Sequence, residues 1–61
     1  MKRRALISHL GNQDCELIRE GGNHSWWGSR ITKRRSAVPR HAEVNDLLVK
    51  KICKDLGITE P

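Results

Sequence analysis

His24 is the side chain in this sequence best suited to acid–base chemistry. It follows Gly21, Gly22 and Asn23 and stands near the start of an expected strand. Imidazole titrates near neutral pH, so it can both accept and donate a proton. In RNA, a deprotonated 2′-hydroxyl attacks the adjacent phosphate, and the leaving 5′-oxygen then needs a proton. One or two histidines can serve both steps, although a lone strand histidine is more often structural.

Two further side chains could assist His24. We expect Arg19 to lie opposite it across a hairpin, where it could hold a phosphate and stabilise developing negative charge. His41, two residues after Pro39, could be a second acid–base group or a phosphate contact; the alternative is an exposed loop histidine. His9 falls on an apolar helical stripe and is expected to be a half-buried packing residue.

The sequence favours neither a metal site nor a cofactor. Zinc ligands usually come in close pairs, whereas the His and Cys residues here are well separated along the chain. The P-loop, nucleophile-elbow and HExxH patterns are absent. Cys15 and Cys53 are expected to be reduced thiols within the core.

Positive charge dominates the composition. Twelve Lys and Arg residues against seven Asp and Glu residues give a formal charge of +5. Such an excess attracts polyanions, so we expect a nucleic acid or an acidic protein as partner. Candidate phosphate contacts cluster around an expected third strand, at Lys33, Arg34, Arg35 and Arg40.

Trp26 and Trp27 are adjacent, so in a strand they point to opposite faces. We expect Trp26 in the core and Trp27 exposed, where it could stack on an RNA base or pack against a partner.

Periodicity predicts five elements. They are a helix over Lys2–Leu10 stopped by Gly11-Asn12, strands over Cys15–Glu20, Asn23–Ser29 and Arg34–Pro39, and a helix over Asn45–Leu56. Pro39 should end its strand because it has no amide donor.

The glycine pair predicts the register of the first hairpin. If Gly21 and Gly22 form a two-residue loop, Glu20 faces Asn23, Arg19 faces His24 and Leu17 faces Trp26. One sheet face would then carry Cys15, Leu17, Arg19, His24, Trp26 and Gly28. A three-residue loop would break this register.

The last helix has clear end signals. Asn45 or Asp46 can cap its start, and Gly57 fits the left-handed position after its end, with Ile58 folding back on Cys53. Its buried stripe is expected to contain Val44, Leu48, Ile52 and Leu56, widened by Leu47 and Cys53.

These elements give an α+β fold of order αβββα. We expect one domain over residues 1–61, with a three-stranded antiparallel sheet covered on one face by two helices, as in double-stranded-RNA-binding-type domains. No apolar run approaches a membrane span and no export signal follows the basic start, so an intracellular protein is expected.

Three segments, in order and in register, resemble the HicA toxins, also called YcfA-like proteins. Arg19–His24 resembles that family's strand–turn–histidine segment, Val38-Pro39-Arg40-His41 its V-P-x-H motif, and Lys51–Ile58 its terminal helix and Gly-Ile ending. The family often has a second polar or histidine residue where Ser25 stands, and no catalytic help is expected from Ser25.

The resemblance implies a cytoplasmic toxin that cleaves mRNA without metal, uses His24 as the catalytic histidine and is neutralised by a HicB-type antitoxin. Two alternatives remain open at this point. One is a non-catalytic RNA- or DNA-binding module of the same fold, and the other is an inactive chain that serves only as an antitoxin ligand.

Overall fold

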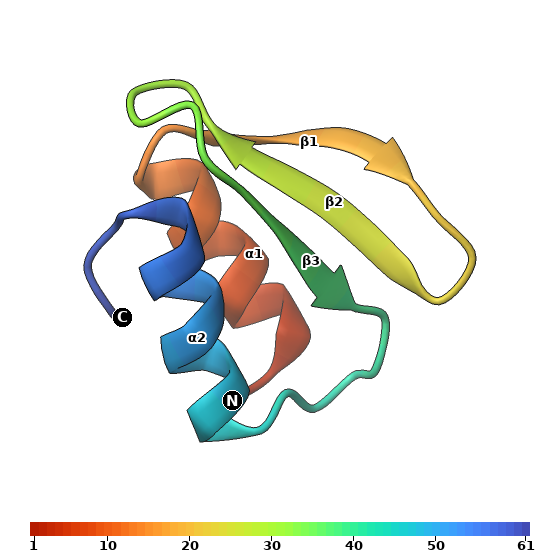
Figure 1. The fold of residues 1–61 in the computed structure, drawn as a ribbon. Helices are drawn as coiled ribbons and strands as arrows, with labels where there is room; N and C mark the ends of the chain where they lie inside the picture. Colours follow the sequence, from red (N-terminus) through yellow and green to blue (C-terminus); the bar gives the residue numbers. More distant parts are fainter.

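A helix, three strands and a second helix follow one another along the chain, as the sequence predicts (Figure 1). The computed structural model describes residues 1–61. The elements are α1 (Arg3–Asn12), β1 (Cys15–Glu20), β2 (His24–Ser29), β3 (Arg35–Pro39) and α2 (Asp46–Leu56).

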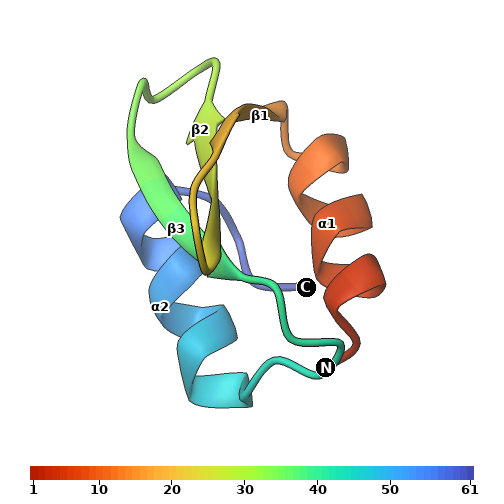
Figure 2. The same cartoon turned by 90° about the vertical axis from the view of Figure 1, so that its right-hand side faces the viewer.

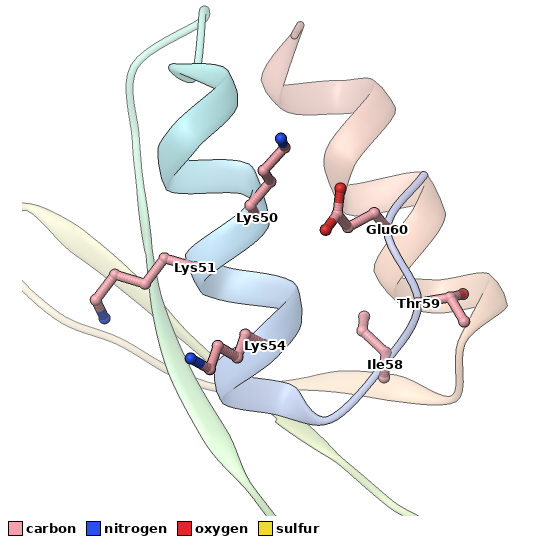
Figure 3. A pocket seen from close by; sticks show the side chains of 6 residues that line it. All are labelled: Lys50, Lys51, Lys54, Ile58, Thr59 and Glu60. Carbon is pink, nitrogen blue, oxygen red and sulfur yellow. The ribbon is translucent and has the colours of Figure 1, made fainter.

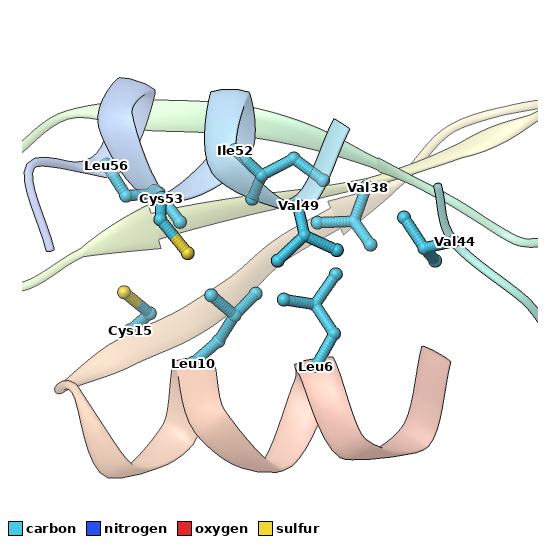
Figure 4. Close-up of a cluster of buried hydrophobic side chains, with 9 residues drawn as sticks. All are labelled: Leu6, Leu10, Cys15, Val38, Val44, Val49, Ile52, Cys53 and Leu56. Atoms are coloured by element: carbon cyan, nitrogen blue, oxygen red, sulfur yellow. The ribbon is translucent and has the colours of Figure 1, made fainter. Parts of the chain in front are cut away.

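The strands form an antiparallel sheet of order β1-β2-β3, and both helices lie on the same side of it (Figure 1). One cluster of nine buried side chains joins the helices to the sheet (Figure 4). Its members are Leu6, Leu10, Cys15, Val38, Val44, Val49, Ile52, Cys53 and Leu56. The predicted fold class is therefore confirmed. No helix covers the other face of the sheet. Neither helix has the length and apolarity that a membrane crossing requires.

Helix α1 is longer than predicted. It continues through Gly11 to Asn12, because the apolar stripe ends before the hydrogen-bonded turns do. Leu6 and Leu10 are fully buried, whereas the neighbouring Ala5 is exposed. His9 is half-buried as expected, and its Nε2 lies 2.7 Å from the carbonyl oxygen of Thr59.

Helix α2 has the predicted caps but a different buried stripe. The Asn45 side chain accepts a hydrogen bond from the Leu47 amide at 2.8 Å, and Gly57 ends the helix with φ at 71°. Leu47 was predicted to be in the core, but its side chain is 75% exposed. Val49 is buried instead, because the buried stripe of α2 runs from Val49 through Ile52 to Leu56.

The cysteines are free thiols buried between β1 and α2 (Figure 4). Burial raises the pKa of both Cys15 and Cys53, which keeps the thiols neutral and poorly nucleophilic. Their role is packing.

The predicted hairpin register is wrong. Glu20 pairs with Ser25, not Asn23, and three residues rather than two lie between the strands; the Gly21 amide donates to the His24 carbonyl at 2.8 Å. A β-bulge between Leu17 and Arg19 then shifts the pairing again. Arg19 consequently faces Trp26 rather than His24, and Leu17 faces Trp27 rather than Trp26.

With this register, the two tryptophans lie on the opposite faces of the sheet from those predicted. Trp27 is half-buried against the core cluster, whereas Trp26 lies on the open face of the sheet with 36% of its surface exposed. The prediction of Trp26 in the core and Trp27 exposed is therefore wrong. The bulge also brings Ile18 over Gly28, where a Cβ would lie only 2.6 Å from the Ile18 Cδ1 atom.

The start of the chain runs beside the segment that joins β3 to α2 (Figure 2). The Arg3 amide donates to the Ala42 carbonyl and the Val44 amide to the Met1 carbonyl, each at 2.8 Å. These bonds fix the chain immediately after His41.

Candidate functional site

His24 is the first residue of β2 and its side chain is exposed. Strand β2 begins one residue later than predicted because Asn23 belongs to the turn and His24 is the first residue that pairs with β3. In the sheet, His24 pairs with Pro39, the last residue of β3. The predicted strand-ending role of Pro39 is confirmed, and the pairing places the chain after Pro39 beside His24.

His24 and His41, far apart in sequence, line one hollow. Its volume is about 530 Å³ and its remaining walls are Gly22, Asn23 and Arg40. The glycine-rich turn therefore meets the Val-Pro-Arg-His segment at one end of the sheet. Two imidazoles and a guanidinium bordering one open hollow provide two groups able to exchange protons and a cation for an anionic ligand.

Arg40 holds the loop that carries His24. Its Nη2 donates to Glu20 Oε1 at 2.8 Å and to the Gly21 carbonyl at 2.6 Å. A guanidinium has five N–H donors, so these bonds leave others for a ligand in the hollow. Arg40 is thus both a tether for the loop and part of the wall.

Glu20 and Ser25 connect this tether to α1. Ser25 is fully buried; its hydroxyl donates to Glu20 Oε1 at 2.6 Å and accepts from Arg3 Nη2 at 2.9 Å. The Nε of Arg3 also donates to the Pro39 carbonyl at 2.8 Å. One hydrogen-bonded network therefore fixes both strand ends that border the hollow.

The network sets the charge state of Glu20. The hydrogen bond from Ser25 lowers the pKa of its carboxyl below the ordinary value of 4.5, and the hydrogen bond and charge of Arg40 lower it further. Glu20 is thus held as a carboxylate, which is the form that accepts from both neighbours.

Sequence reasoning did not identify Arg3 or Glu20 as site residues and set Ser25 aside. Ser25 lies between two exposed side chains on the strand and therefore points inward, where its hydroxyl needs partners; the prediction of Trp26 in the core concealed this. Nothing in the spacing of Arg3 indicates its reach to β2 and β3.

Arg19 does not border the hollow. The bulge moves it opposite Trp26, so the predicted pairing of Arg19 with His24 is wrong. Arg19 instead lines a smaller hollow of about 200 Å³ on the open face with Ile18, Trp26 and Arg35.

The predicted basic cluster is divided. Arg40 borders the His24 hollow, Arg35 lies on the open face, and Lys33 and Arg34 lie in or next to the turn between β2 and β3, at the opposite end of the sheet. Arg34 is next to Gly57, where a Cβ would lie 3.3 Å from its Nη1. Strand β3 itself begins at Arg35, one residue later than predicted.

A larger hollow lies elsewhere on the molecule. It has a volume of about 650 Å³ and lies between α2 and the C-terminal segment (Figure 3). Its walls include lysines but no histidine; they are Lys50, Lys51, Lys54, Ile58, Thr59 and Glu60. Lys51 is paired with Asp55 at 2.8 Å, and this hollow is a charged surface without an imidazole.

These features define a small α+β domain of the double-stranded-RNA-binding-like class, with a hollow containing two histidines at one end of its sheet. A family profile described as the HicA toxin of bacterial toxin–antitoxin matches residues 3–58. The chain belongs to this family of HicA toxins and is thus a toxin of a toxin–antitoxin system. Searches of curated proteins and of solved structures gave no significant match.

Proposed function

We propose that this toxin is a metal-independent endoribonuclease that cleaves mRNA with His24 as its catalytic acid–base. The observation that carries the proposal is the shared hollow, in which exposed His24 is accompanied by His41 and Arg40. Membership of the HicA family supports the same assignment.

The proposed reaction is an internal transesterification. One imidazole takes the proton of the RNA 2′-hydroxyl, and the 2′-oxygen forms a bond to the adjacent phosphorus. The bond from phosphorus to the 5′-oxygen breaks, and the second imidazole protonates that oxygen. The products are a 2′,3′-cyclic phosphate and a free 5′-hydroxyl. His24 and His41 are the two imidazoles in this proposal.

Arg40 takes the phosphate-binding role that the sequence assigned to Arg19. It borders the hollow and can stabilise the charge that develops on the phosphoryl oxygens. Arg35, Lys33 and Arg34 are proposed to contact phosphates further along the RNA. Trp27 is not proposed as an RNA contact because it packs against the core.

The proposed inhibitor is a HicB-type antitoxin with an acidic surface. A chain of charge +5 favours such a partner, and covering the hollow would keep RNA away from His24. Both proposed partners, mRNA and antitoxin, place the activity in the cytoplasm.

The decisive test is RNA cleavage by His24→Ala in the presence of EDTA. The side chain is exposed, so the variant should fold, and loss of general acid–base catalysis should lower the rate by about 10²–10⁴-fold. His9→Gln is the matched control, because His9 lies outside the hollow. It should cleave RNA at the parent rate.

Equal rates for His24→Ala and the parent would remove His24 from the chemistry. A parent protein that shifts RNA in a gel but leaves it intact would instead select the second function, a non-catalytic RNA-binding module of the same fold.

A further inference from the structure

The face of the sheet away from the helices has an aromatic centre. Trp26 lies there on the central strand, with Arg19 directly opposite it on β1 and Arg35 two residue pairs further along on β3. Together with Ile18 these side chains line the hollow of about 200 Å³. An indole with 36% of its surface exposed, set in a hollow, offers a flat apolar contact.

Both charged residues that line this hollow are arginines. Neither Arg19 nor Arg35 has a carboxylate within 4.0 Å, in contrast to Arg30 and Arg40, which pair with Glu16 and Glu20. Two unpaired guanidinium groups beside an exposed aromatic ring match single-stranded nucleic acid, in which a base stacks on the ring and phosphates meet the cations.

The face is continuous with the His24 hollow. Residues two apart on a strand point to the same side and lie about 6.5 Å apart, so His24 and Trp26 are neighbours on one face. The indole also lies against the loop that carries His24, since a Cβ on Gly21 would be 3.6 Å from Trp26 Nε1. A nucleotide attached to a phosphate at His24 can therefore reach Trp26.

We propose that the open face of the sheet binds single-stranded RNA, with the base next to the cleaved phosphate stacked on Trp26 and neighbouring phosphates held by Arg19 and Arg35. This inference rests on the proposed ribonuclease function and names its substrate class. A paired base in a duplex has both of its faces covered by stacking, so duplex RNA cannot use Trp26 in this way.

The test is the affinity of a short, fluorescently labelled 2′-O-methyl oligonucleotide, measured by anisotropy. Its blocked 2′-oxygen prevents cleavage, so binding is measured without chemistry. Trp26→Leu keeps an apolar side chain over the sheet but removes the ring, and should raise Kd by about 5- to 150-fold. Trp26→Phe retains an aromatic ring, so its affinity for the oligonucleotide should fall much less.

The arginines provide a second measurement that does not depend on Trp26. Arg19→Ala and Arg35→Ala should each flatten the slope of log K against log salt by about 0.7. Lys50→Ala and Lys54→Ala, on α2 in the other large hollow, are the matched controls and should leave that slope unchanged.

The inference is overturned if Trp26→Leu binds the single strand as tightly as the parent. It is also overturned if a duplex of the same sequence binds equally well, or if Trp26→Leu weakens only binding of an acidic protein partner. Failure of the proposed function has a different signature. The parent would then bind the 2′-O-methyl strand through Trp26 but leave ordinary RNA uncut.

Discussion

Glu20 contributes to the site through its neighbours. It accepts from Ser25 and Arg40, and so joins the end of β1 to the segment that carries His41. No proton transfer is assigned to it. Its proposed role is to keep His24 and His41 at the separation that the reaction needs, which makes Glu20 a positioning residue.

Replacing Glu20 by Gln tests whether Glu20 acts by positioning the loop rather than by taking part in proton transfer. The amide removes the negative charge that Arg40 and Ser25 favour, so the loop should loosen and cleavage should fall by about 10- to 100-fold, mostly in kcat. Glu16→Gln is the matched control, because Glu16 also lies on β1 and pairs with an arginine, Arg30, away from the hollow. Equal losses in the two variants would show a general effect of strand charge.

Because Glu20 is held as a carboxylate, the stability of the loop that carries His24 should depend on pH. Because its pKa in the folded protein is below 4.5, the carboxylate stabilises the loop above pH 4.5, and this contribution is lost as the pH falls through the folded-state pKa. Protection of the Gly21 amide, which bonds to the His24 carbonyl, should decrease over that range in the parent. In Glu20→Gln that decrease should be absent.

At the scale of elements, the β-bulge decides which side chains the open face presents. The order of elements and the caps of α2 follow from local signals, namely apolar periodicity, Asn45 and Gly57, and these were predictable. No local sequence signal predicts the bulge. It depends on how Ile18 and Arg19 fit over Gly28 and Trp26 in the neighbouring strand, so a register counted from the glycine pair was wrong.

The site was predictable to the extent that motifs carry it. His24, His41 and Arg40 were identified in sequence, and the pairing of His24 with Pro39 brings them together. The hydrogen-bonded network that supports them was not identified, because Arg3 contacts β2 and β3 from a helix more than twenty residues earlier in the chain. Contacts of this kind follow from packing, and no residue spacing records them.

A double-mutant cycle tests the bulge. Gly28→Ala places a methyl group 2.6 Å from the Ile18 Cδ1 atom, so the Ile18 side chain must move and the free energy of unfolding should fall by about 1 kcal/mol. Ile18→Val removes that carbon, and in this background Gly28→Ala should cost clearly less. Urea unfolding of the four proteins measures the coupling. Additive effects would mean that Ile18 does not lie over Gly28.

At the scale of the whole molecule, charge and size act together. Four of the twelve Lys and Arg side chains pair with carboxylates, namely Lys2, Arg30, Arg40 and Lys51, and the other eight do not. The core that supports them contains only nine buried apolar side chains. A domain of this size is marginally stable on its own, so a partner that binds the folded state adds a large share of stability.

Binding of an acidic antitoxin over the His24 hollow should therefore be visible in two ways. At a free partner concentration of 100 times Kd, the free energy of unfolding should rise by about 2.7 kcal/mol. Amide hydrogen exchange on the complex should slow across residues 23–27 and near His41, because these segments border the hollow and the Trp26 face.

Trp26→Leu should weaken the complex, since an exposed aromatic side chain is a common anchor of interfaces. Protection confined to α1 and α2, with residues 23–27 still exchanging freely, would contradict direct occlusion, and inhibition would then have to act on the site from a distance.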